Sequence, residues 1–370
     1  MAEYYTGTKF RGKRPKRSGR WGYVLLVADL IATIAMVLLL LCTIATIIGQ
    51  YVSPSTWRLL SVISLGAPMI YLLDVAVMFY WVARWRWYRA VVMIVTVVIG
   101  LFYLPRYYNI SLDRQYPTTY RERAYTKIMT YNVLEGKKAE LVPYIRKHNP
   151  DIICLQEMTI GSDNWNELVT TYKHTYKPDV GKGGNQILSK YKILQSGGIG
   201  DLPRRTATWA DLKIADDTVR VVSLHLQSTS IRPEDTHFIE GGGYIRDNDR
   251  EVKLRSIVSR LVENNAKRAE QAELVADFLA QTPHRKIVCG DFNDVPLSYT
   301  YHTIAKELND SFTEGAVGFA YTYDTQYRLL RIDNILVSPE IEVASYDVDN
   351  EIRLSDHFPV VARVKVDVER

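Results

Sequence analysis

The chain has 370 residues, of which 47% are hydrophobic and 24% are charged, and its formal net charge is +5. This length allows one large domain or two smaller ones, each with its own core. The three cysteines lack the Cys/His spacing of a zinc site, and the basic residues lack the regular basic and aromatic pattern of a duplex-DNA reader. Most long apolar runs lie in roughly the first hundred residues, which divides the chain into a membrane part and a water-soluble part.

A cluster of basic residues, KFRGKRPKRSGR at 9–20, precedes the first apolar run. Such a cluster can bind nucleic acid, but directly before an apolar segment it is more simply a signal that this end stays in the cytoplasm. The same charges favour anionic lipid headgroups. We therefore predict that residues 1–20 form a basic cytoplasmic tail.

Three hydrophobic segments, at 23–52, about 59–82 and 90–105, predict a transmembrane region of about three helices over residues 21–105. The first exceeds the roughly 20 residues that cross a bilayer and the apolar part of a signal peptide. The third has an apolar core of only about 16 residues, or roughly 24 Å of helix, and it decides on which side the rest of the chain lies. We expect it to span, which places the remainder outside the cytoplasm.

Two acidic residues, Asp29 and Asp74, fall within these predicted spans. An ionisable group is costly inside a bilayer, so each is either a functional residue or a partner for a polar group on a neighbouring helix. We favour the second alternative for Asp29 and leave both alternatives open for Asp74.

Polar residues return from about Tyr116, and we expect a linker over 106–124 and a catalytic domain over 125–370. Short runs rich in β-branched residues, among them KIMTYNV, DIICLQE, VRVVSLHLQ, RKIVCGDFN and RIDNILVS, predict strands. Helices are predicted over 139–149 and 255–281. Strands with inserted helices are typical of two packed sheets that are covered by helices.

Polar residues interrupt or close these strands at several points. They are Asn132, Glu157, His225, Asp291, Asn293, Asp333, Asp356 and His357. Each one alone has an ordinary explanation, such as a turn residue, a helix cap or a buried histidine with a bonding partner. Taken together they are costly, because an unpaired buried group costs several kcal/mol unless it is bonded or binds a metal. A shared site at one end of the sheets accounts for all of them.

Phosphoester hydrolysis is the chemistry that fits these residue types. Glu157 and Asp356 are oxygen ligands suited to a hard divalent cation, which would neutralise a phosphate. Asp291 can orient or deprotonate an attacking water. Asn293 lies on the same face of an extended strand and can hold that carboxylate or a phosphate oxygen.

Cationic contacts to a phosphorylated substrate can come from several side chains. His357 can contact the phosphate if Asp333 positions its ring. Arg205 and Arg331 are further candidates for substrate binding, although scattered arginines are usually surface residues.

At these positions the sequence resembles the endonuclease/exonuclease/phosphatase superfamily, which includes pancreatic-type DNases, abasic-site endonucleases, inositol-polyphosphate 5-phosphatases and neutral sphingomyelinases. The motifs that carry the resemblance, in order over about 125–368, are TYNV, LQE, SLHLQ, GDFND, RIDNIL and SDHFPV. The resemblance implies a four-layered α/β/β/α sandwich of the DNase I-like type. It also implies a phosphoesterase that depends on one or two Mg²⁺ or Mn²⁺ ions.

The same resemblance implies a role for each site residue. Glu157 would be the main metal ligand, with Asn132 and Asp356 near the metal. The catalytic residues would be Asp291, His357, His225, Asn293 and Asp333, of which Asn293 and His225 would also contact the substrate. The sequence departs from the DNase pattern in one respect, because GKGGNQILSK lacks the glutamate that partners the histidine corresponding to His225.

The N-terminal part resembles a membrane-anchored branch of the superfamily in bacteria of the Bacteroidetes type, in which a three-span leader carries a turn like YVSP at 51–54. This implies a multi-pass inner-membrane protein with a periplasmic catalytic domain. Anchoring favours a lipid-linked phosphate over nucleic acid, because a tethered site gains effective concentration for substrates in the same plane. A nuclease and a catalytically silent binding module are the alternatives, and no protein partner is predicted.

Two long connections, 228–254 and 313–331, are expected to determine substrate choice, since binding residues concentrate on loops. Cys154 and Cys289 lie in apolar strands, and we expect them, like Cys42, to be free thiols.

Overall fold

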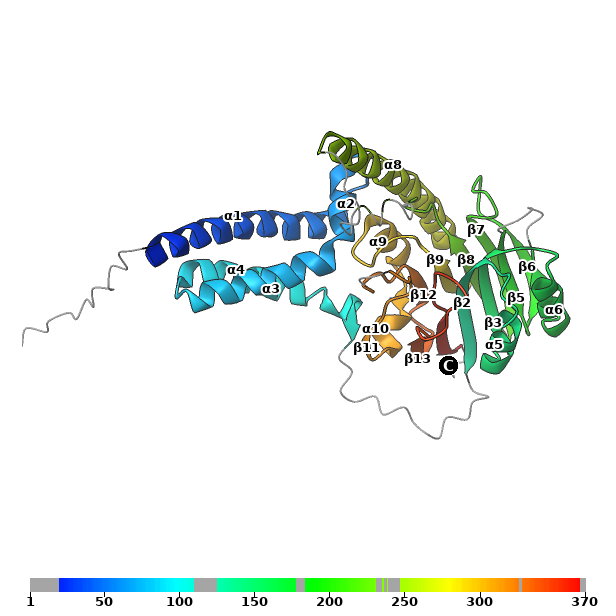
Figure 1. Ribbon diagram of the computed structural model, residues 1–370. Helices are drawn as coiled ribbons and strands as arrows, with labels where there is room; N and C mark the ends of the chain where they lie inside the picture. The colour runs from blue at the N-terminus through cyan, green and yellow to red at the C-terminus, as the bar shows by residue number, and fades with distance from the viewer. Residues whose placement is uncertain are drawn as a thin grey trace, which may run out of the picture.

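The computed structural model describes most of the chain, and its helical N-terminal part extends away from a body of sheets and helices (Figure 1). The described residues are 20–109, 125–177, 184–230, 235, 238, 247–325 and 328–366. The predicted basic tail and most of the predicted linker, at 1–19 and 110–124, lie outside the described residues.

The first helix, α1 (Arg20–Gly49), is apolar on all sides. Its stretch Trp21–Gly49 has a mean hydropathy of 2.8 in its most apolar window, and none of that window is buried. A helix that is hydrophobic all round belongs in a large core or in a membrane. Among the described residues, it is the one helix that is long and apolar enough to cross a bilayer alone.

The second predicted span is broken. It consists of α2 (Arg58–Leu65) and α3 (Ala67–Ala83), which are bent by 69° relative to each other at Gly66. Pro68, in the first turn of α3, has no N–H with which to continue the hydrogen bonds of α2. The third predicted span, α4 (Trp87–Leu101), has only 15 residues, or about 22 Å of helix. The structure therefore supports one of the three predicted spans by length and composition, or two if the bent pair counts as one.

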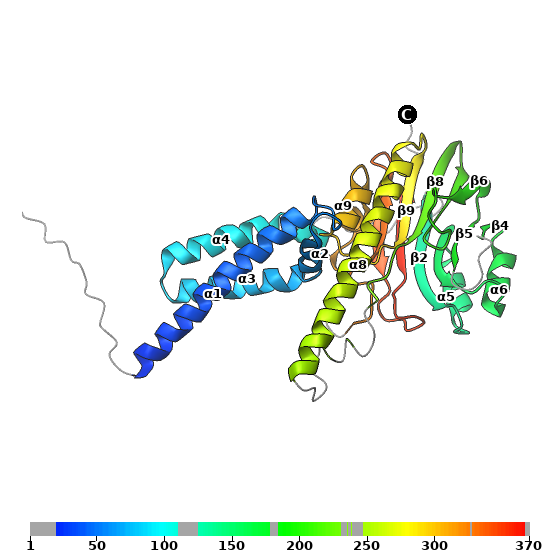
Figure 2. The same ribbon diagram turned by 90° about the horizontal axis from the view of Figure 1, so that it is seen from above.

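The helices α1, α3 and α4 run side by side, while α2 turns across toward the catalytic domain (Figures 1 and 2). Both acidic residues of this region have polar partners on neighbouring segments. Asp29 of α1 pairs with Arg84, whose Nε lies 2.8 Å from Asp29 Oδ1. Asp74 of α3 accepts a hydrogen bond of 2.6 Å from Thr43 Oγ1 of α1. A structural role therefore accounts for Asp29, whereas Asp74 has a partner for only one of its two buried oxygens.

The rest of the chain forms two six-stranded sheets with the same pattern of strand directions. The first has the order β13-β14-β2-β3-β5-β4, and the second has the order β10-β12-β9-β8-β7-β6. In each sheet the two central strands, β2 with β3 and β8 with β9, are parallel, and the other pairs are antiparallel. The bounds in the first sheet are β2 (Thr126–Glu135), β3 (Ile152–Met158), β4 (His174–Tyr176), β5 (Gly184–Ser189), β13 (Glu342–Val348) and β14 (Val360–Lys365). Those in the second are β6 (Lys192–Gly198), β7 (Ala207–Ile214), β8 (Asp217–His225), β9 (Arg285–Asp291), β10 (Asn309–Asp310) and β12 (Asp333–Val337).

Successive side chains of each strand point to opposite faces of its sheet, which gives each sheet one inner and one outer core. One face of β2 carries Ile128 into a core shared by both sheets, and the opposite face carries Met129 and Tyr131 into a second core. That second core is covered by α5 (Leu141–His148) and α6 (Asp163–Thr171). The outer face of the second sheet packs against α8 (Asp247–Ala280) and α9 (Tyr299–Ala305). The result is the expected four-layered α/β/β/α sandwich.

Smaller elements complete the fold around these layers. They are η1 (Leu104–Arg106), β1 (Tyr108–Asn109), α10 (Ser311–Gly315) and β11 (Gly318–Phe319). The cysteines are free as predicted, and Cys154 and Cys289 are buried between the sheets.

The N-terminal helices dock on the catalytic domain through specific contacts. The guanidinium of Arg106 donates to Gln50 Oε1 at 2.5 Å and to the Pro296 carbonyl at 3.1 Å. Ala67, at the start of α3, packs against Leu297 and Tyr107. These contacts fix the bend between α2 and α3 against the same end of the domain that carries the polar residues considered next.

Candidate active site

The strand order brings the predicted polar residues to one end of the two sheets. Asn132 and Glu157 lie near the carboxyl ends of the parallel strands β2 and β3, and His225 and Asp291 end the parallel strands β8 and β9. Parallel strands end at the same edge, so each pair is adjacent. Asp333 begins the antiparallel strand β12 directly opposite Asp291, and so reaches this edge as well.

Local backbone geometry aims these side chains. Glu157 has a φ of 61° and interrupts the pairing of β3 with β5, so it forms a bulge that turns its carboxylate toward the site. Asn293 also has a positive φ of 53°. Gly290 has a φ of 134°, and a Cβ there would lie 2.0 Å from the carbonyl oxygen of Leu224. Only glycine allows β8 and β9 to approach so closely beside Asp291. Non-glycine residues with positive φ are strained and concentrate at functional sites.

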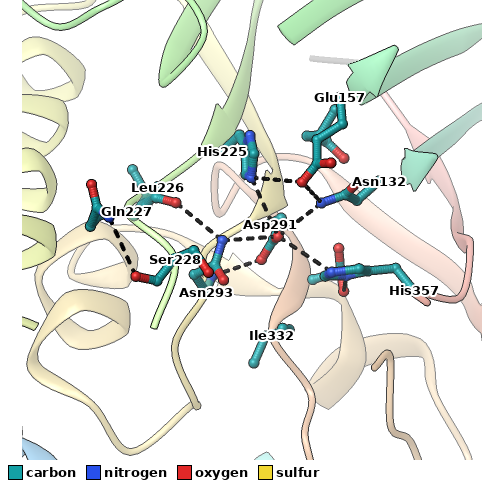
Figure 3. A network of polar contacts seen from close by, with 12 residues as sticks. Asn132, Glu157, His225, Leu226, Gln227, Ser228, Asp291, Asn293, Ile332 and His357 are labelled. Carbon is teal, nitrogen blue, oxygen red and sulfur yellow. Dashed lines mark hydrogen bonds and ion pairs between the residues drawn. The ribbon is translucent and has the colours of Figure 1, made fainter. Parts of the chain in front are cut away.

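Asn132 joins the two sheets at the centre of the site (Figure 3). Its Nδ2 donates to Glu157 Oε1 at 3.1 Å and to Asp291 Oδ2 at 3.2 Å. One amide thus holds two carboxylates from different sheets near each other.

The Asp291 carboxylate is held from a second side by Asn293. The Asn293 backbone N–H donates to Asp291 Oδ1 at 2.8 Å, and Asn293 Nδ2 donates to Asp291 Oδ2 at 3.0 Å and to the Leu226 carbonyl at 3.1 Å. Asp291 is only 1% exposed. These donors fix its orientation and offset the cost of burying its charge.

Two histidines face the same carboxylates (Figure 3). His225 Nε2 lies 3.4 Å from Glu157 Oε1 and 3.9 Å from Asp291 Oδ2. On the other side, His357 Nε2 lies 3.7 Å from Asp291 Oδ2, while His357 Nδ1 is hydrogen-bonded to Asp333 Oδ2 at 2.9 Å.

The buried environment shifts the pKa of both members of this last pair. Burial alone would lower the pKa of His357, but the Asp333 and Asp291 carboxylates outweigh it and raise the pKa to about 10. Burial raises the pKa of Asp333 to about 6, against the opposing effect of His357 and its hydrogen bond. The electrostatics therefore favour an imidazolium whose Nε2–H faces the site.

A cavity of about 400 Å³ opens over these groups. Its polar floor is Asn132, Glu157, His225, Asp291, Asn293, Asp356 and His357. The two connections that were expected to determine substrate choice also line the cavity. The first contributes Ser228 and Thr229, and the second contributes Tyr323, Thr325, Leu329 and Leu330. The remaining lining residues are Ile332 and, from the N-terminal helices, Leu65, Pro68 and Met69. Sequence reasoning missed these last three, since nothing in an apolar span marks a residue that faces a distant site.

The sequence comparison identifies the family. The profile of the Endonuclease/Exonuclease/phosphatase family matches residues 129–357, which is more than half of the chain and includes every residue of the polar floor. The chain belongs to this family. A second profile, a domain of unknown function (DUF8431), matches residues 26–107. Comparison with curated proteins gives no match.

Several solved structures are similar to part of this chain. A humanized TDP2 of D. rerio has 16% identity and a TM-score of 0.48, with 65% of this chain and 99% of that chain covered. The mannosyl-6-phosphatase of Bacteroides thetaiotaomicron has 17% identity and a TM-score of 0.44, with 65% of this chain and 99% of that chain covered. An AP endonuclease from Archaeoglobus fulgidus has 17% identity and a TM-score of 0.45, with 64% of this chain and 98% of that chain covered.

The site of this family member has an excess of negative charge. Glu157, Asp291, Asp333 and Asp356 converge on it, and every ion pair that they form among the described residues is with a histidine. Within the same residues, no lysine or arginine lies within ion-pairing distance of them. Carboxylate and amide oxygens without a lysine or arginine partner are a donor set suited to a hard divalent cation. The residues present therefore fit the metal dependence of the family.

One group of side chains could also be read as a ligand set. Asp291, Asp333 and His357 each offer an atom within 4.8 Å of the others, and all are buried. However, His357 Nδ1 is already hydrogen-bonded to Asp333 Oδ2 at 2.9 Å, so two members of this group are partners of each other. Glu157 and Asp356 are less buried and face the cavity, which makes them better candidates.

The two predicted arginine contacts are not part of the cavity wall. Arg205 is exposed and does not line the cavity. Arg331 is completely buried and forms an ion pair with Asp310 at 2.7 Å, so its predicted substrate contact is corrected to a structural role. A buried arginine requires such a partner, and Asp310 already provides it.

Proposed function

We propose that this protein is a membrane-anchored, divalent-metal-dependent phosphoesterase that hydrolyses a lipid-linked phosphate ester. The observation that carries the reaction class is the convergence of Glu157, Asp291 and Asp356 in one cavity, with no lysine or arginine partner among the described residues. His357 lines the same cavity, and Asp333 is hydrogen-bonded to its ring. Such a site can hold a cation and a phosphate together.

In this proposal, Glu157, Asn132 and Asp356 hold one or two Mg²⁺ or Mn²⁺ ions. The bound cation supplies Lewis-acid stabilisation of the charge that develops on the phosphate. Asp291 orients the attacking water and removes its proton, because its carboxylate is already fixed by Asn293 and Asn132.

The histidines act on the phosphate and on the departing group. The Nε2–H of His357 donates to a phosphate oxygen, and Asp333 keeps the ring oriented through Nδ1. His225 lies beside Glu157 at the opposite rim and is placed to contact the leaving oxygen. Asn293 is assigned to positioning Asp291, with a phosphate contact as its second predicted role.

The proposed substrate class follows from the proposed attachment of the catalytic domain to a membrane. We propose that α1 crosses the inner membrane of a bacterium with its N-terminus in the cytoplasm, and that α3 and α4 enter the bilayer beside it, so that the catalytic domain is periplasmic. A site held at the membrane surface gains effective concentration for substrates in that membrane. Protease added outside spheroplasts should then remove the catalytic domain, and protection of the domain would contradict this orientation.

The reaction is tested with the purified full-length protein in lipid nanodiscs. Substrates are polyprenyl phosphate, phosphatidic acid, a soluble phosphodiester and plasmid DNA, each with Mg²⁺, Mn²⁺ or EDTA. Asp291→Asn should lower the metal-dependent rate by about 10²- to 10⁴-fold, the range of general acid–base catalysis. Asp216→Asn, at an exposed turn, is the matched control and should be unchanged. No metal-dependent turnover of any substrate by folded protein would favour a binding module, and preference for DNA would favour a nuclease.

A further inference from the structure

The active-site cavity has one wall that does not belong to the catalytic domain. Leu65, the last residue of α2, and Pro68 and Met69, in the first turn of α3, line the same cavity as Asp291 and His357. All three side chains are apolar. The N-terminal helices therefore do more than attach the domain to a membrane, because part of the substrate site is built from them.

The wall is held in place by packing on both sides of the bend. Ala67, between the wall residues, is completely buried against Leu297 and Tyr107. Earlier in α2, Ser61 Oγ accepts a hydrogen bond of 3.0 Å from Asn265 Nδ2 of α8. The wall is thus a fixed part of the fold rather than the tip of a loop.

Arg106, which follows α4, connects the end of α1 to the catalytic domain through its hydrogen bonds. Arg106 contacts Gln50, just after α1, and the Pro296 carbonyl of the catalytic domain. Its own carbonyl oxygen accepts a hydrogen bond of 3.1 Å from Arg331 Nη2. The bend therefore cannot move away from the site without breaking several of these contacts.

Another part of the cavity wall is apolar as well. Leu329, Leu330 and Ile332 lie in the segment before β12 and line the cavity together with the three helix residues. A ligand here meets apolar side chains from two parts of the chain and charged groups at the floor. Such a site is suited to an amphiphile, because an apolar chain can pack against these six side chains, which offer no side-chain hydrogen bond to a polar group.

The direction of the helices adds a second argument. From Met69 onward, α3 runs beside α1 and α4, away from the catalytic domain (Figures 1 and 2). Large apolar side chains on these helices are exposed, including Leu72, Leu73 and Phe79 on α3. The cavity wall is therefore continuous with the surface that a bilayer would cover.

We infer that Leu65, Pro68 and Met69 bind the apolar chain of the substrate, and that they select a phosphate ester of a long-chain alcohol. The phosphate would lie at the polar floor, and the first carbons of the chain would lie between the helix wall and Leu329, Leu330 and Ile332. This inference rests on the proposed function and names the chain specificity of the same site.

The test is a series of ethyl, hexyl and decyl phosphate esters, in the monoester or methyl diester form that the enzyme hydrolyses. Full-length protein in nanodiscs carries Leu65→Asn or Met69→Gln, and kcat and KM are measured separately. Leu59→Asn is the matched control, since Leu59 is on the same helix as Leu65, is 60% exposed and does not line the cavity.

We expect the wild type to prefer the decyl ester. Each wall variant should lose at least about tenfold in kcat/KM for the decyl ester, mainly through KM, and remain unchanged for the ethyl ester. The Leu59 variant should match the wild type with both. Equal rates for all chain lengths, or an unchanged preference in both wall variants, would overturn the inference and leave the phosphoesterase in place.

Two further outcomes separate the inference from its premise. Absence of hydrolysis of every ester by the wild type would overturn the proposed function itself. Loss of both the ethyl and the decyl reactions in Leu65→Asn would indicate misfolding of that variant. Met69→Gln then decides, because Met69 is 46% exposed and its replacement disturbs little packing.

Discussion

Replacement of Arg331 by methionine should destabilise the catalytic domain without acting directly on the chemistry. Arg331 is 0% exposed, and its guanidinium donates to Asp310 Oδ2 at 2.7 Å, to Asn334 Oδ1 at 2.8 Å and to the Arg106 carbonyl at 3.1 Å. Burial alone would lower its pKa, but Asp310 outweighs burial and raises the pKa above its usual value. The charge is therefore kept inside the protein.

The expected magnitude follows from what the substitution leaves behind. Arg331→Met removes the cation and leaves the Asp310 carboxylate buried with Tyr301 and a backbone N–H as its donors. Breaking one side of a buried ion pair costs about 3–5 kcal/mol. For a domain of this size, this corresponds to a fall of roughly 6–20 °C in Tm. In Arg331→Met/Asp310→Asn the orphan charge is absent, so part of the loss should be recovered.

Thermal unfolding of the full-length protein in nanodiscs, with kcat and KM measured well below Tm, tests this reasoning. The four proteins of the cycle are the wild type, Arg331→Met, Asp310→Asn and the double variant, and their Tm values give the coupling between the two sites. A variant Arg331→Met with unchanged Tm and a strongly raised KM would refute the structural role and restore the substrate contact that the sequence predicted.

Three other outcomes are expected. Gly290→Ala should lower the free energy of unfolding by at least about 2 kcal/mol, because its Cβ would overlap the Leu224 carbonyl. Gly200 also has a positive φ but has open space around it, so Gly200→Ala should lower the free energy of unfolding by less in the same experiment. Asp333→Asn should lower kcat more than it changes KM, since it removes the acceptor that orients His357; an unchanged kcat would contradict the positioning role. Mg²⁺ at about 100 times its Kd should stabilise the wild type by about 2.7 kcal/mol. Glu157→Gln should lose most of this stabilisation, and equal metal-induced Tm shifts in the two proteins would exclude Glu157 as a main ligand.

The sequence predicted the polar floor of the site because residues at the carboxyl ends of neighbouring parallel strands lie close together. Asn132, Glu157, His225 and Asp291 each stood near the end of an apolar strand, and the central strands of both sheets are parallel, so these ends meet. Order and chemistry were therefore sufficient to predict which residues come together.

Features that depend on partners far along the chain could not be predicted in this way. The partner of Arg331, Asp310, is 21 residues away at the N-cap of α10, so nothing local distinguished this arginine from a surface one. The break at Gly66 had a signal in the residues Gly-Ala-Pro, but their effect depends on packing against α8 and Leu297. The apolar wall could not be predicted for the same reason.

The position of β14 in the first sheet has a consequence for biosynthesis. Among the described residues, β14 follows every other strand in sequence and pairs with β2, the first strand of this sheet, while His357 lies just before β14. The candidate active site is therefore complete only when the segment that contains His357 and β14 has been made and inserted between β13 and β2. A chain that is still being synthesised, or that ends early by a nonsense mutation or proteolysis, has its helices and most of its carboxylates but lacks the histidine. If His357 contacts the phosphate as proposed, such fragments would be inert toward phosphate esters.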